Sequence, residues 1–242
     1  AGFTIIADSI PSRSLACSVP LPVILGLEER LEGPLLTWMA QQAYTAVVLE
    51  GGQHDDPLTA RTCLAALWLM LARAKVVDHD HPRIEPARAH LQRVSYGLPR
   101  VMDLSYVHPV EPGDTYVMEP GWRNFMRVCR DQSLALQNGE IVQAPLDGYM
   151  LMPLYQGLGK EGYFLCRPVS LAWITLSRWA RRSRLEFVLW AAPGVRSLDL
   201  RQGTCRTQRR LARSVVGALH LLGYRKRVLT GDDEALWHRK PQ

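Results

Sequence analysis

One stretch in the first quarter of the chain limits the possible folds more than any other. Four apolar residues, Ala46 to Leu49, run directly into Glu50, two glycines and a group of polar side chains that ends at Pro57. A short apolar run bounded by glycines is typical of a buried strand, and a proline after polar residues can occupy the first turn of a helix. The sequence therefore places the carboxylate of Glu50 at the end of a strand.

The position of Glu50 has two interpretations. In open α/β sheets, ligands bind where strands end, because the loops there hold reactive groups on a rigid base. Glu50 is then a candidate general acid or base. Alternatively, Glu50 caps the following helix or pairs with a neighbouring arginine, and spacing alone favours neither interpretation.

Strand and helix patterns alternate through residues 1–82. Apolar runs predict strands at residues 3–7, 22–25 and 45–49. Helical spacing predicts a helix from about Pro57 to Lys75 with one apolar face. That face carries Leu64, Leu67, Trp68 and Leu71. The alternation predicts an α/β layer with at least some parallel strand pairing.

The segment from Asp78 to Pro82 breaks this pattern, and we place a domain boundary there. In an extended segment His79 and His81 point the same way, so they are candidate metal ligands. No third ligand lies nearby in the sequence, which favours a solvated linker instead. Arginine-rich, poorly periodic sequence follows as far as Arg93.

Between residues 94 and 170 the sequence changes to short alternating runs separated by Pro, Gly, Asn and Asp, which predicts a small β domain. Asp147-Gly148 is typical of a hairpin, because Asp-Gly supplies the positive φ that a tight turn requires. The segment from Gly139 to Gly148 also resembles the lipoyl and biotinyl half-barrels, so we expect a barrel-sandwich-like domain. Those carriers present a lysine at the hairpin tip. This segment has none, so a swinging-arm carrier role is not supported.

Residues 171–242 are strongly basic. They hold 15 of the 29 Lys and Arg but 5 of the 23 Asp and Glu, which leaves residues 1–170 slightly acidic. Amphipathic spacing predicts helices over 171–190 and 206–222, and therefore a basic helical C-terminal extension. The apolar face of the first helix carries Trp173, Leu176, Ala180 and Phe187. Its arginines lie off that face or at its edge: Arg178, Arg181, Arg182 and Arg184.

The first of these helices has two interpretations. A basic amphipathic helix can lie on an anionic membrane or bind an acidic partner. Alternatively, it packs on the β domain and leaves its arginines in solvent. No nucleic-acid-binding motif accompanies the positive charge, so we do not predict DNA or RNA binding.

The composition is that of an ordinary globular protein, with 47% hydrophobic and 21% charged residues among 242. Five scattered cysteines without a Cys-x-x-Cys pair favour a reducing compartment, and we expect a cytoplasmic protein. No charged leader and no apolar run of about 18 residues indicates secretion or a membrane span. Because the chain begins with Ala1 and enters a strand-like run at once, we expect a fragment or a processed chain.

Several segments together resemble one enzyme family. Leu49 to Pro57 resembles the catalytic-glutamate segment of the succinylglutamate desuccinylase/aspartoacylase family, a branch of the zinc carboxypeptidase superfamily. Glu119–Phe125 and Ala144–Gln156 follow in the same order, and Leu221–Arg225 resembles a terminal stretch of some bacterial members. The resemblance implies a partial zinc-carboxypeptidase-like α/β layer followed by a small β domain and a basic tail. The corresponding ranges are 1–82, 94–170 and 171–242.

Members of this family use one zinc ion to hydrolyse an amide and remove an acyl group from an amino acid. The resemblance therefore implies a small N-acyl amino acid as substrate and Glu50 as both general base and general acid. It also implies that Gln53 and His54 line the substrate pocket, although loop hydrogen bonding explains both residues equally well. Tyr163 is the candidate for a tyrosine that reaches the active site from the β domain, with Tyr155 as its competitor.

Other parts of the family's pattern are missing. Neither a His-Gly-x-Glu nor an Asp-Leu-His context, which would supply the three zinc ligands, occurs in this sequence. We expect the zinc ligands upstream of Ala1 and the chain alone to be inactive, as the carboxyl-terminal portion of a longer enzyme or as a non-catalytic remnant. No arginine that could hold a substrate carboxylate precedes Glu50 closely. N-acetylaspartate and succinylglutamate themselves are therefore not expected substrates.

A competing hypothesis is a binding module without catalysis. In that case the β domain and the basic helices dock on a partner or on an anionic membrane surface, and Glu50 is vestigial. The surroundings of the Glu50 carboxylate separate the two hypotheses, because a catalytic carboxylate must be accessible to substrate.

Overall fold

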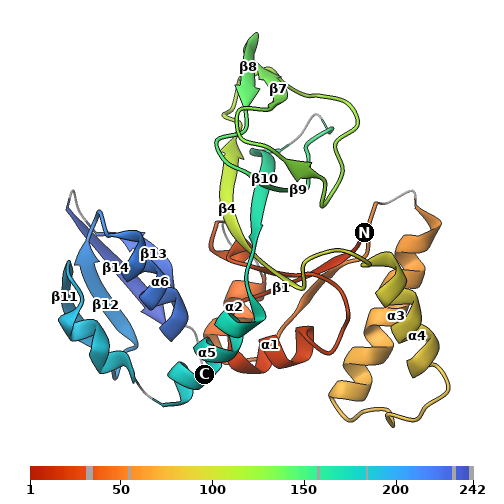
Figure 1. The fold of residues 1–242 in the computed structure, drawn as a ribbon, viewed down its shortest axis with the longest axis horizontal. Coiled ribbons are helices and arrows are strands. Elements are labelled where there is room, and N and C mark those ends of the chain that lie inside the picture. Colours follow the sequence, from red (N-terminus) through yellow and green to blue (C-terminus); the bar gives the residue numbers. More distant parts are fainter. Residues whose placement is uncertain (31–34, 54–55, 157–158, 184, 231–232, 240–242) are drawn as a thin grey trace.

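The computed structural model describes residues 1–30, 35–53, 56–156, 159–183, 185–230 and 233–239 (Figure 1). These residues form an α/β layer, a β region above it in the view of Figure 1 and a C-terminal region to its left. Their strands belong to sheets of seven, four and three strands. The mixed α/β class expected from the sequence is confirmed.

The seven-stranded sheet joins the α/β layer to the β region, with the strand order β3-β1-β2-β4-β10-β9-β6. Its strands in the α/β layer are β1 (Phe3–Ile6), β2 (Val23–Leu25), β3 (Val48–Glu50) and the first part of β4 (Val101–Pro109). The strands β1, β2 and β4 are parallel, whereas β3 lies antiparallel to β1 at the sheet edge. Both β1 and β2 are buried along their whole length, as is typical of parallel strands covered on both faces.

Short and long helices connect these strands. They are α1 (Ile10–Ala16), the 3₁₀ helix η1 (Leu27–Glu29), α2 (Leu35–Gln41), α3 (Pro57–Arg73) and α4 (Ile84–Val94). A side-chain cap begins α1, where the hydroxyl of Ser9 accepts a hydrogen bond from the backbone N–H of Ser12. At α3 the carboxylate of Asp56 accepts from the N–H of Leu58, and Pro57 occupies the first turn as predicted.

Two expectations about α3 and α4 are wrong. The arginine-rich segment, for which the sequence analysis found little periodicity and predicted no helix, forms α4, which packs on α3 through Ile84 and Leu91. The buried face of α3 is rich in small residues such as Ala66, whereas Leu64 and Leu67 of the predicted face are about half exposed. Alanine has no side chain beyond Cβ, so this face can approach its neighbours closely.

The β region consists of antiparallel strands. They are β5 (Tyr116–Met118), β6 (Arg127–Val128), β7 (Ser133–Gln137), β8 (Glu140–Gln143), β9 (Gly148–Leu151) and β10 (Glu161–Pro168). Strand β10 pairs with β4 and β9 in the main sheet, while β5, β7 and β8 form the three-stranded sheet. No strand pairing in the described part of the chain closes a barrel, so the expected barrel-like domain is not observed.

The hairpin turn of this region is not at Asp147-Gly148. Strands β8 and β9, which flank that dipeptide, belong to different sheets. The turn lies instead at Asn138-Gly139 between β7 and β8, where φ is 54° and 83°. Asn-Gly favours such a turn because both residues tolerate positive φ. The carboxylate of Asp147 instead accepts a hydrogen bond from the N–H of Arg130.

The C-terminal region is not the helical extension that we expected. Its elements are α5 (Leu171–Arg182), the 3₁₀ helix η2 (Leu185–Ala191), β11 (Val195–Asp199), β12 (Thr204–Gln208), α6 (Arg213–Leu222), β13 (Tyr224–Leu229) and β14 (Glu234–Arg239). The strands form an antiparallel sheet in the order β11-β12-β14-β13. Cys205 and Thr207 are buried, whereas Arg206 and Gln208 are exposed. This period of two is that of a strand, so the helix predicted over 206–222 is wrong at its start, whereas α6 confirms it over residues 213–222.

The burial of α5 also differs from the prediction. Its buried residues are Ser177, Ala180 and Arg181, and Arg181 is only 1% exposed. Leu176 of the predicted apolar face is exposed. Arg184 lies outside the described residues. Among the helices that the structure describes, none has the length and apolar character that a membrane span requires.

Candidate functional site

Glu50 is the last residue of β3, as the sequence predicts, and it lies opposite Phe3 in the antiparallel pairing with β1. Because β3 runs against β1, the end of β3 lies beside the start of β1. The carboxyl ends of the parallel strands β1 and β2, at Ile6 and Leu25, lie at the opposite end of the sheet. Glu50 is therefore at a strand end but not in the crevice where the parallel strands end.

The Glu50 side chain is partly exposed. Within the described residues its carboxylate has no hydrogen-bond or ion-pair partner. The following helix is capped by Asp56 instead, and no described arginine pairs with Glu50. The structural role that we considered for Glu50, as a helix cap or an ion-pair partner, is therefore not observed.

The glycines after Glu50 are explained by packing. A Cβ atom on Gly51 would collide with Sγ of Cys63 and lie 2.9 Å from the carbonyl oxygen of Thr59. Gly52 has a φ of 145°, and a Cβ there would lie 2.8 Å from Oγ1 of Thr59. The loop therefore runs against α3 at a distance that only glycine permits, which fixes the backbone beside Glu50.

Gln53 is exposed, and its backbone carbonyl accepts a hydrogen bond of 2.6 Å from the hydroxyl of Thr59. The loop hydrogen bonding that we considered for this position is therefore present, through the backbone. His54 lies outside the described residues. A pocket-lining role for the two side chains stays a prediction.

Tyr163 lies on β10 and is fully buried in the β region. Its ring stacks on that of His108, with centroids 5.0 Å apart and planes inclined by 2°. Burial raises the pKa of its phenol. Because its hydrophobic cluster contains no residue of β1 or β3, the structure does not bring Tyr163 together with Glu50.

Tyr155, the competing candidate, is half exposed, but its hydroxyl holds a loop. That hydroxyl donates to the carbonyl of Glu119 and accepts from the N–H of Trp122, each at 2.8 Å. A buried stacked ring and a loop-fixing hydroxyl are both structural features. The substrate contact expected of Tyr163 stays a prediction.

The described residues do not fit a zinc ion. Among them there is no group of three or more His, Cys, Asp and Glu side chains that could hold a metal. The ring of His81, one of the two candidate ligands in the loop before α4, stacks on Trp68 at 4.7 Å. His108 and Glu111 have His-x-x-Glu spacing, but His108 is hydrogen-bonded through both ring nitrogens, to Tyr106 and Gln137. A catalytic zinc site needs three protein ligands.

A second carboxylate, Asp8, lies just after β1 and is fully buried. Arg13 of α1 donates to it at 2.5 Å. Arg181 of α5 donates at 2.9 Å, and Arg225 of β13 lies at 3.5 Å. Burial alone would raise the pKa of Asp8, but the three guanidinium groups outweigh it and hold that pKa well below its usual range.

Arg181 and Arg225 connect this cluster to other elements. Arg181 donates to the carbonyl groups of His220 and Leu221 in the last turn of α6, where a cation is favourable. Arg225 donates to Glu29 at 3.0 Å and also pairs with Asp103 of β4. The cluster therefore ties the α/β layer to the C-terminal region. We refer to Asp8 with Arg13, Arg181 and Arg225 as the Asp8 cluster.

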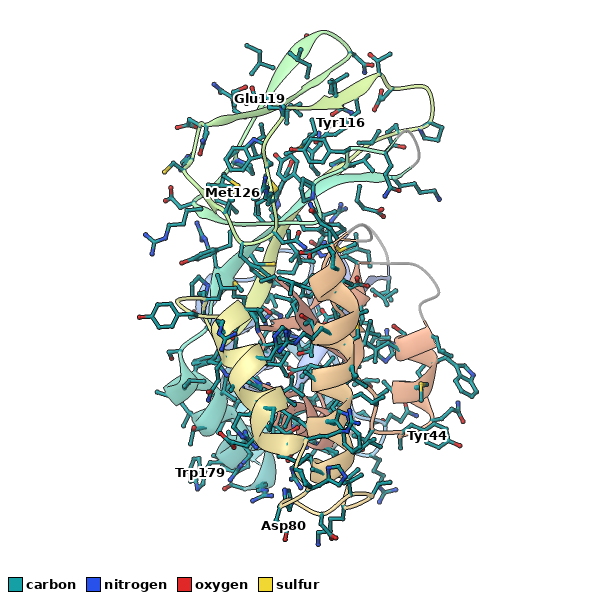
Figure 2. All side chains as sticks on the ribbon, turned by 90° about the vertical axis from the view of Figure 1, so that its right-hand side faces the viewer. Tyr44, Asp80, Tyr116, Glu119, Met126 and Trp179 are labelled. Atoms are coloured by element: carbon teal, nitrogen blue, oxygen red, sulfur yellow. The ribbon has the colours of Figure 1, made fainter. Side chains whose placement is uncertain are left out.

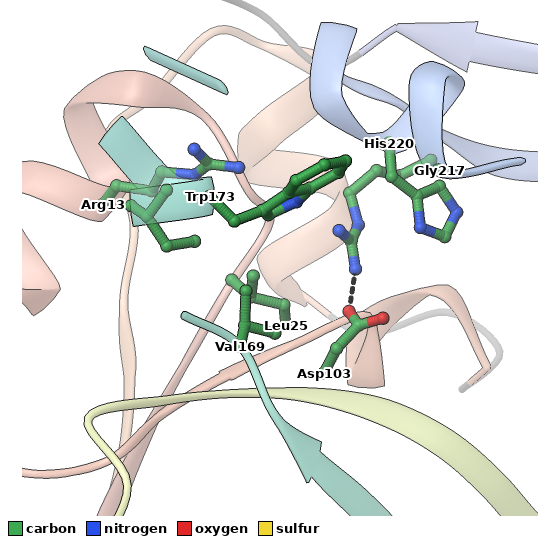
Figure 3. Close-up of a pocket in the computed structure, with 9 residues that line it drawn as sticks. Arg13, Leu25, Asp103, Val169, Trp173, Gly217 and His220 are labelled. Carbon is green, nitrogen blue, oxygen red and sulfur yellow. Dashed lines mark hydrogen bonds and ion pairs between the residues drawn. The ribbon is translucent and has the colours of Figure 1, made fainter. Parts of the chain in front are cut away.

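Beside the Asp8 cluster lies a cavity of about 180 Å³ (Figure 3). Its lining comes from β2, β4, α1, α5, α6 and β13, and includes Trp173 and His220. Burial, with Arg225 adding to it, lowers the pKa of His220 to about 3, so its imidazole is neutral at pH 7. The guanidinium groups around the cavity already hold carboxylates, so its charged lining is a structural assembly rather than an open binding site.

Sequence reasoning missed the Asp8 cluster. Asp8 has a positive φ of 42°, which is uncommon for a residue other than glycine, but the sequence alone does not reveal it. Arg181 lies 173 residues further along the chain, so no local spacing could pair the two. The sequence analysis placed Arg181 with the other arginines off the apolar face, so nothing in the helical pattern marked it as buried.

No family model matches this sequence, and none of the curated proteins searched matches it. Among solved structures, the chain is similar to succinylglutamate desuccinylase from Vibrio parahaemolyticus, with 13% identity and a TM-score of 0.47 over 70% of this chain and 49% of that one. It is also similar to the apo ectoine utilization protein EutE (DoeB) from Ruegeria pomeroyi, with 16% identity and a TM-score of 0.45 over 69% and 55%. The chain spans about half the length of these solved structures.

Proposed function

We propose that this chain contributes the proton-transfer carboxylate of a hydrolase that cleaves small linear amides, such as N-acyl amino acids. One observation carries the proposal. Glu50 is partly exposed at the rigid end of β3, and its carboxylate has no partner among the described residues. A carboxylate that neither caps a helix nor balances a charge is available to bind and move a proton. The resemblance of residues 49–57 supplies the reaction class.

The proposed chemistry needs one proton carrier. Glu50 accepts a proton from a water molecule while the water oxygen attacks the amide carbonyl carbon and forms a tetrahedral intermediate. The carbon–nitrogen bond then breaks, and the protonated Glu50 returns its proton to the departing nitrogen. The products are a carboxylic acid and a free amine, and Glu50 is again ionised.

Zinc dependence belongs to the same resemblance and stays a proposal. Because no ligand group occurs within the described residues, such an ion would need ligands outside them or on another chain.

The test compares Glu50→Gln with the unchanged protein. The protein is tagged in its natural host and purified, so that any polypeptide attached to it is retained, and amine release from a panel of N-acyl amino acids is measured. Loss of a general base typically lowers the rate by about 10²–10⁴-fold, and we expect an effect of that size on kcat. The assay is repeated with a chelator and with added Zn²⁺.

Glu85→Gln is the matched control, because Glu85 is an exposed glutamate on α4 whose one ion pair within the described part of the chain is a loose one with Arg88 at 3.8 Å. Its activity should equal that of the unchanged protein. Amide hydrolysis that survives Glu50→Gln would contradict the proposal. So would the absence of hydrolysis across the panel at every metal condition.

A further inference from the structure

Two exposed stripes run along α5. The first is apolar and contains Ala172, Leu176 and Trp179 at helical spacing, with Leu176 45% and Trp179 59% exposed. The second lies beside it and contains Leu171, Thr175, Arg178 and Arg182. Figure 2 shows Trp179 at the outer edge of the molecule. We refer to these two stripes as the α5 surface.

The exposure of the α5 surface is enforced by the opposite face of the helix. There Arg181 holds Asp8, and the hydroxyl of Ser177 donates to the carbonyl of Leu221 at 2.7 Å. Ser177 also accepts a hydrogen bond from Arg13. Turning the apolar stripe inward would break these buried polar contacts and leave Asp8 without one of its arginines, and breaking a buried ion pair is strongly destabilising.

The 3₁₀ helix η2, which follows α5, also exposes apolar side chains. Phe187, Val188 and Trp190 are each more than half exposed, while Leu189 is buried and holds the segment in place. Like α5, this segment therefore leaves aromatic and aliphatic side chains exposed.

The exposed charged side chains described on α5 and η2 are all basic. Between Ser170 and Leu198 the sequence contains a single acidic residue, Glu186, which is buried and paired with Arg239. Arg178 and Arg182 are exposed on α5. Exposed apolar groups beside arginines, with no exposed acid between them, complement an anionic surface that has an apolar interior.

We propose that the α5 surface and η2 dock this protein on an anionic lipid membrane. Leu176, Trp179 and Phe187 enter the boundary between the headgroups and the acyl chains, and Arg178 and Arg182 lie among the anionic headgroups. Tryptophan and arginine suit this boundary, because each combines an apolar body with a polar end. The helix lies in the plane of the membrane, since α5 is far too short to span it.

The test is co-sedimentation of the full chain with phosphatidylcholine vesicles, with and without phosphatidylserine. We expect binding that depends on phosphatidylserine and weakens with added salt. The double variant Leu176→Ser/Trp179→Ser should lower the partition coefficient by about tenfold or more, because two buried apolar side chains are lost. Arg178→Gln and Arg182→Gln should each lower it by about fivefold, from roughly 1 kcal/mol per basic residue near the surface.

The matched control is Val117→Ser/Ile141→Ser in the β region. Both side chains are at least as exposed as Trp179, and the strands β5 and β8 that hold them contain no arginine. That variant should bind vesicles like the unchanged protein. Far-UV circular dichroism and thermal unfolding confirm that each variant is folded. Equal binding to neutral and anionic vesicles, or no binding to either, would overturn the proposal.

Two other outcomes would also overturn it. Vesicle binding that is lost in the arginine variants but kept in Leu176→Ser/Trp179→Ser would show a charged surface that does not insert. Equal loss in the control variant would show nonspecific adsorption of exposed apolar groups. In either case an acidic protein would become the better candidate for the occupant of the α5 surface.

Discussion

Two carboxylates in this molecule lie where strands end, yet their environments are opposite. Asp8 follows β1 and is fully buried among three guanidinium groups. Glu50 ends β3, is partly exposed and has no partner among the described residues. The cause is strand direction. The end of β1 faces the C-terminal region, whereas β3 is antiparallel and ends at the opposite side of the sheet. Whether a carboxylate at a strand end is paired within the fold or remains without a partner therefore depends on the elements that cover that end of the sheet.

The largest expected effect is at Asp8. Asp8→Asn keeps the shape of the side chain and tolerates the positive φ, but it removes the charge that balances three buried arginines. Leaving buried charges without their partner typically costs about 3–5 kcal/mol, and we expect a loss of that size in the free energy of unfolding. Urea denaturation at neutral pH measures it.

The control for this variant is Asp80→Asn, because Asp80 is exposed in the loop before α4. It should change the free energy of unfolding by less than about 0.5 kcal/mol, as is usual for surface substitutions. A similar small change in Asp8→Asn would mean that the Asp8 cluster does not hold the α/β layer to the C-terminal region.

The next effect is a dependence of stability on pH that comes mainly from His220, which lies beside the Asp8 cluster. The pKa of His220 is lowered to about 3 by burial and by Arg225. In the unfolded chain a histidine takes up its proton near pH 6.5, so below about pH 6.5 the unfolded state binds more protons than the folded state. Stability therefore falls as the pH decreases from about 6.5 towards 3. The lowered pKa of Asp8 adds a loss in the same direction, but only below about pH 4.

His220→Gln separates the two contributions, because glutamine cannot take up a proton in this range. In the variant, urea unfolding should show a much smaller loss of stability between about pH 6.5 and 4.5. The remaining loss comes from His90, whose pKa is also lowered by burial, and the Asp8 loss should remain at lower pH. His79→Gln in the exposed loop before α4 is the control and should keep the pH dependence of the unchanged protein. An unchanged pH profile in His220→Gln would show that this histidine is not the source.

A smaller effect tests the rigidity of the loop beside Glu50. Gly51→Ala places a methyl group against Cys63 and Thr59 of α3, and overpacking of this kind typically costs about 1–3 kcal/mol in the free energy of unfolding. Gly217→Ala is the matched control. A Cβ there would lie 3.9 Å from Trp173 in ordinary contact, and alanine favours a helix interior such as that of α6. If Gly51→Ala were as stable as Gly217→Ala, the loop would not be fixed by its contact with α3.

The sequence predicted local features well and long-range features poorly. The three strands of the α/β layer and the position of Glu50 at a strand end follow from short apolar runs and glycines, which act within a few residues. The direction of β3 and the burial of Arg181 depend on partners far along the chain, so local spacing could not supply them. In α5 the amphipathic pattern was real, but the ion pairs of the opposite face decided its orientation.

The smallest expected effect is on stability in Glu50→Gln, and it is the most informative for function. Because the Glu50 carboxylate has no hydrogen-bond or ion-pair partner among the described residues, its replacement by an amide should change the free energy of unfolding by less than about 0.5 kcal/mol. Urea denaturation of Glu50→Gln and of Asp8→Asn under the same conditions compares the two losses directly. A loss of more than about 1 kcal/mol would indicate that the charge of Glu50 holds the fold, as that of Asp8 does. The loss of activity proposed for this variant would then have a structural cause. If the stability is unchanged, the fold does not need the Glu50 carboxylate, and the proposed proton transfer accounts for a carboxylate at this strand end.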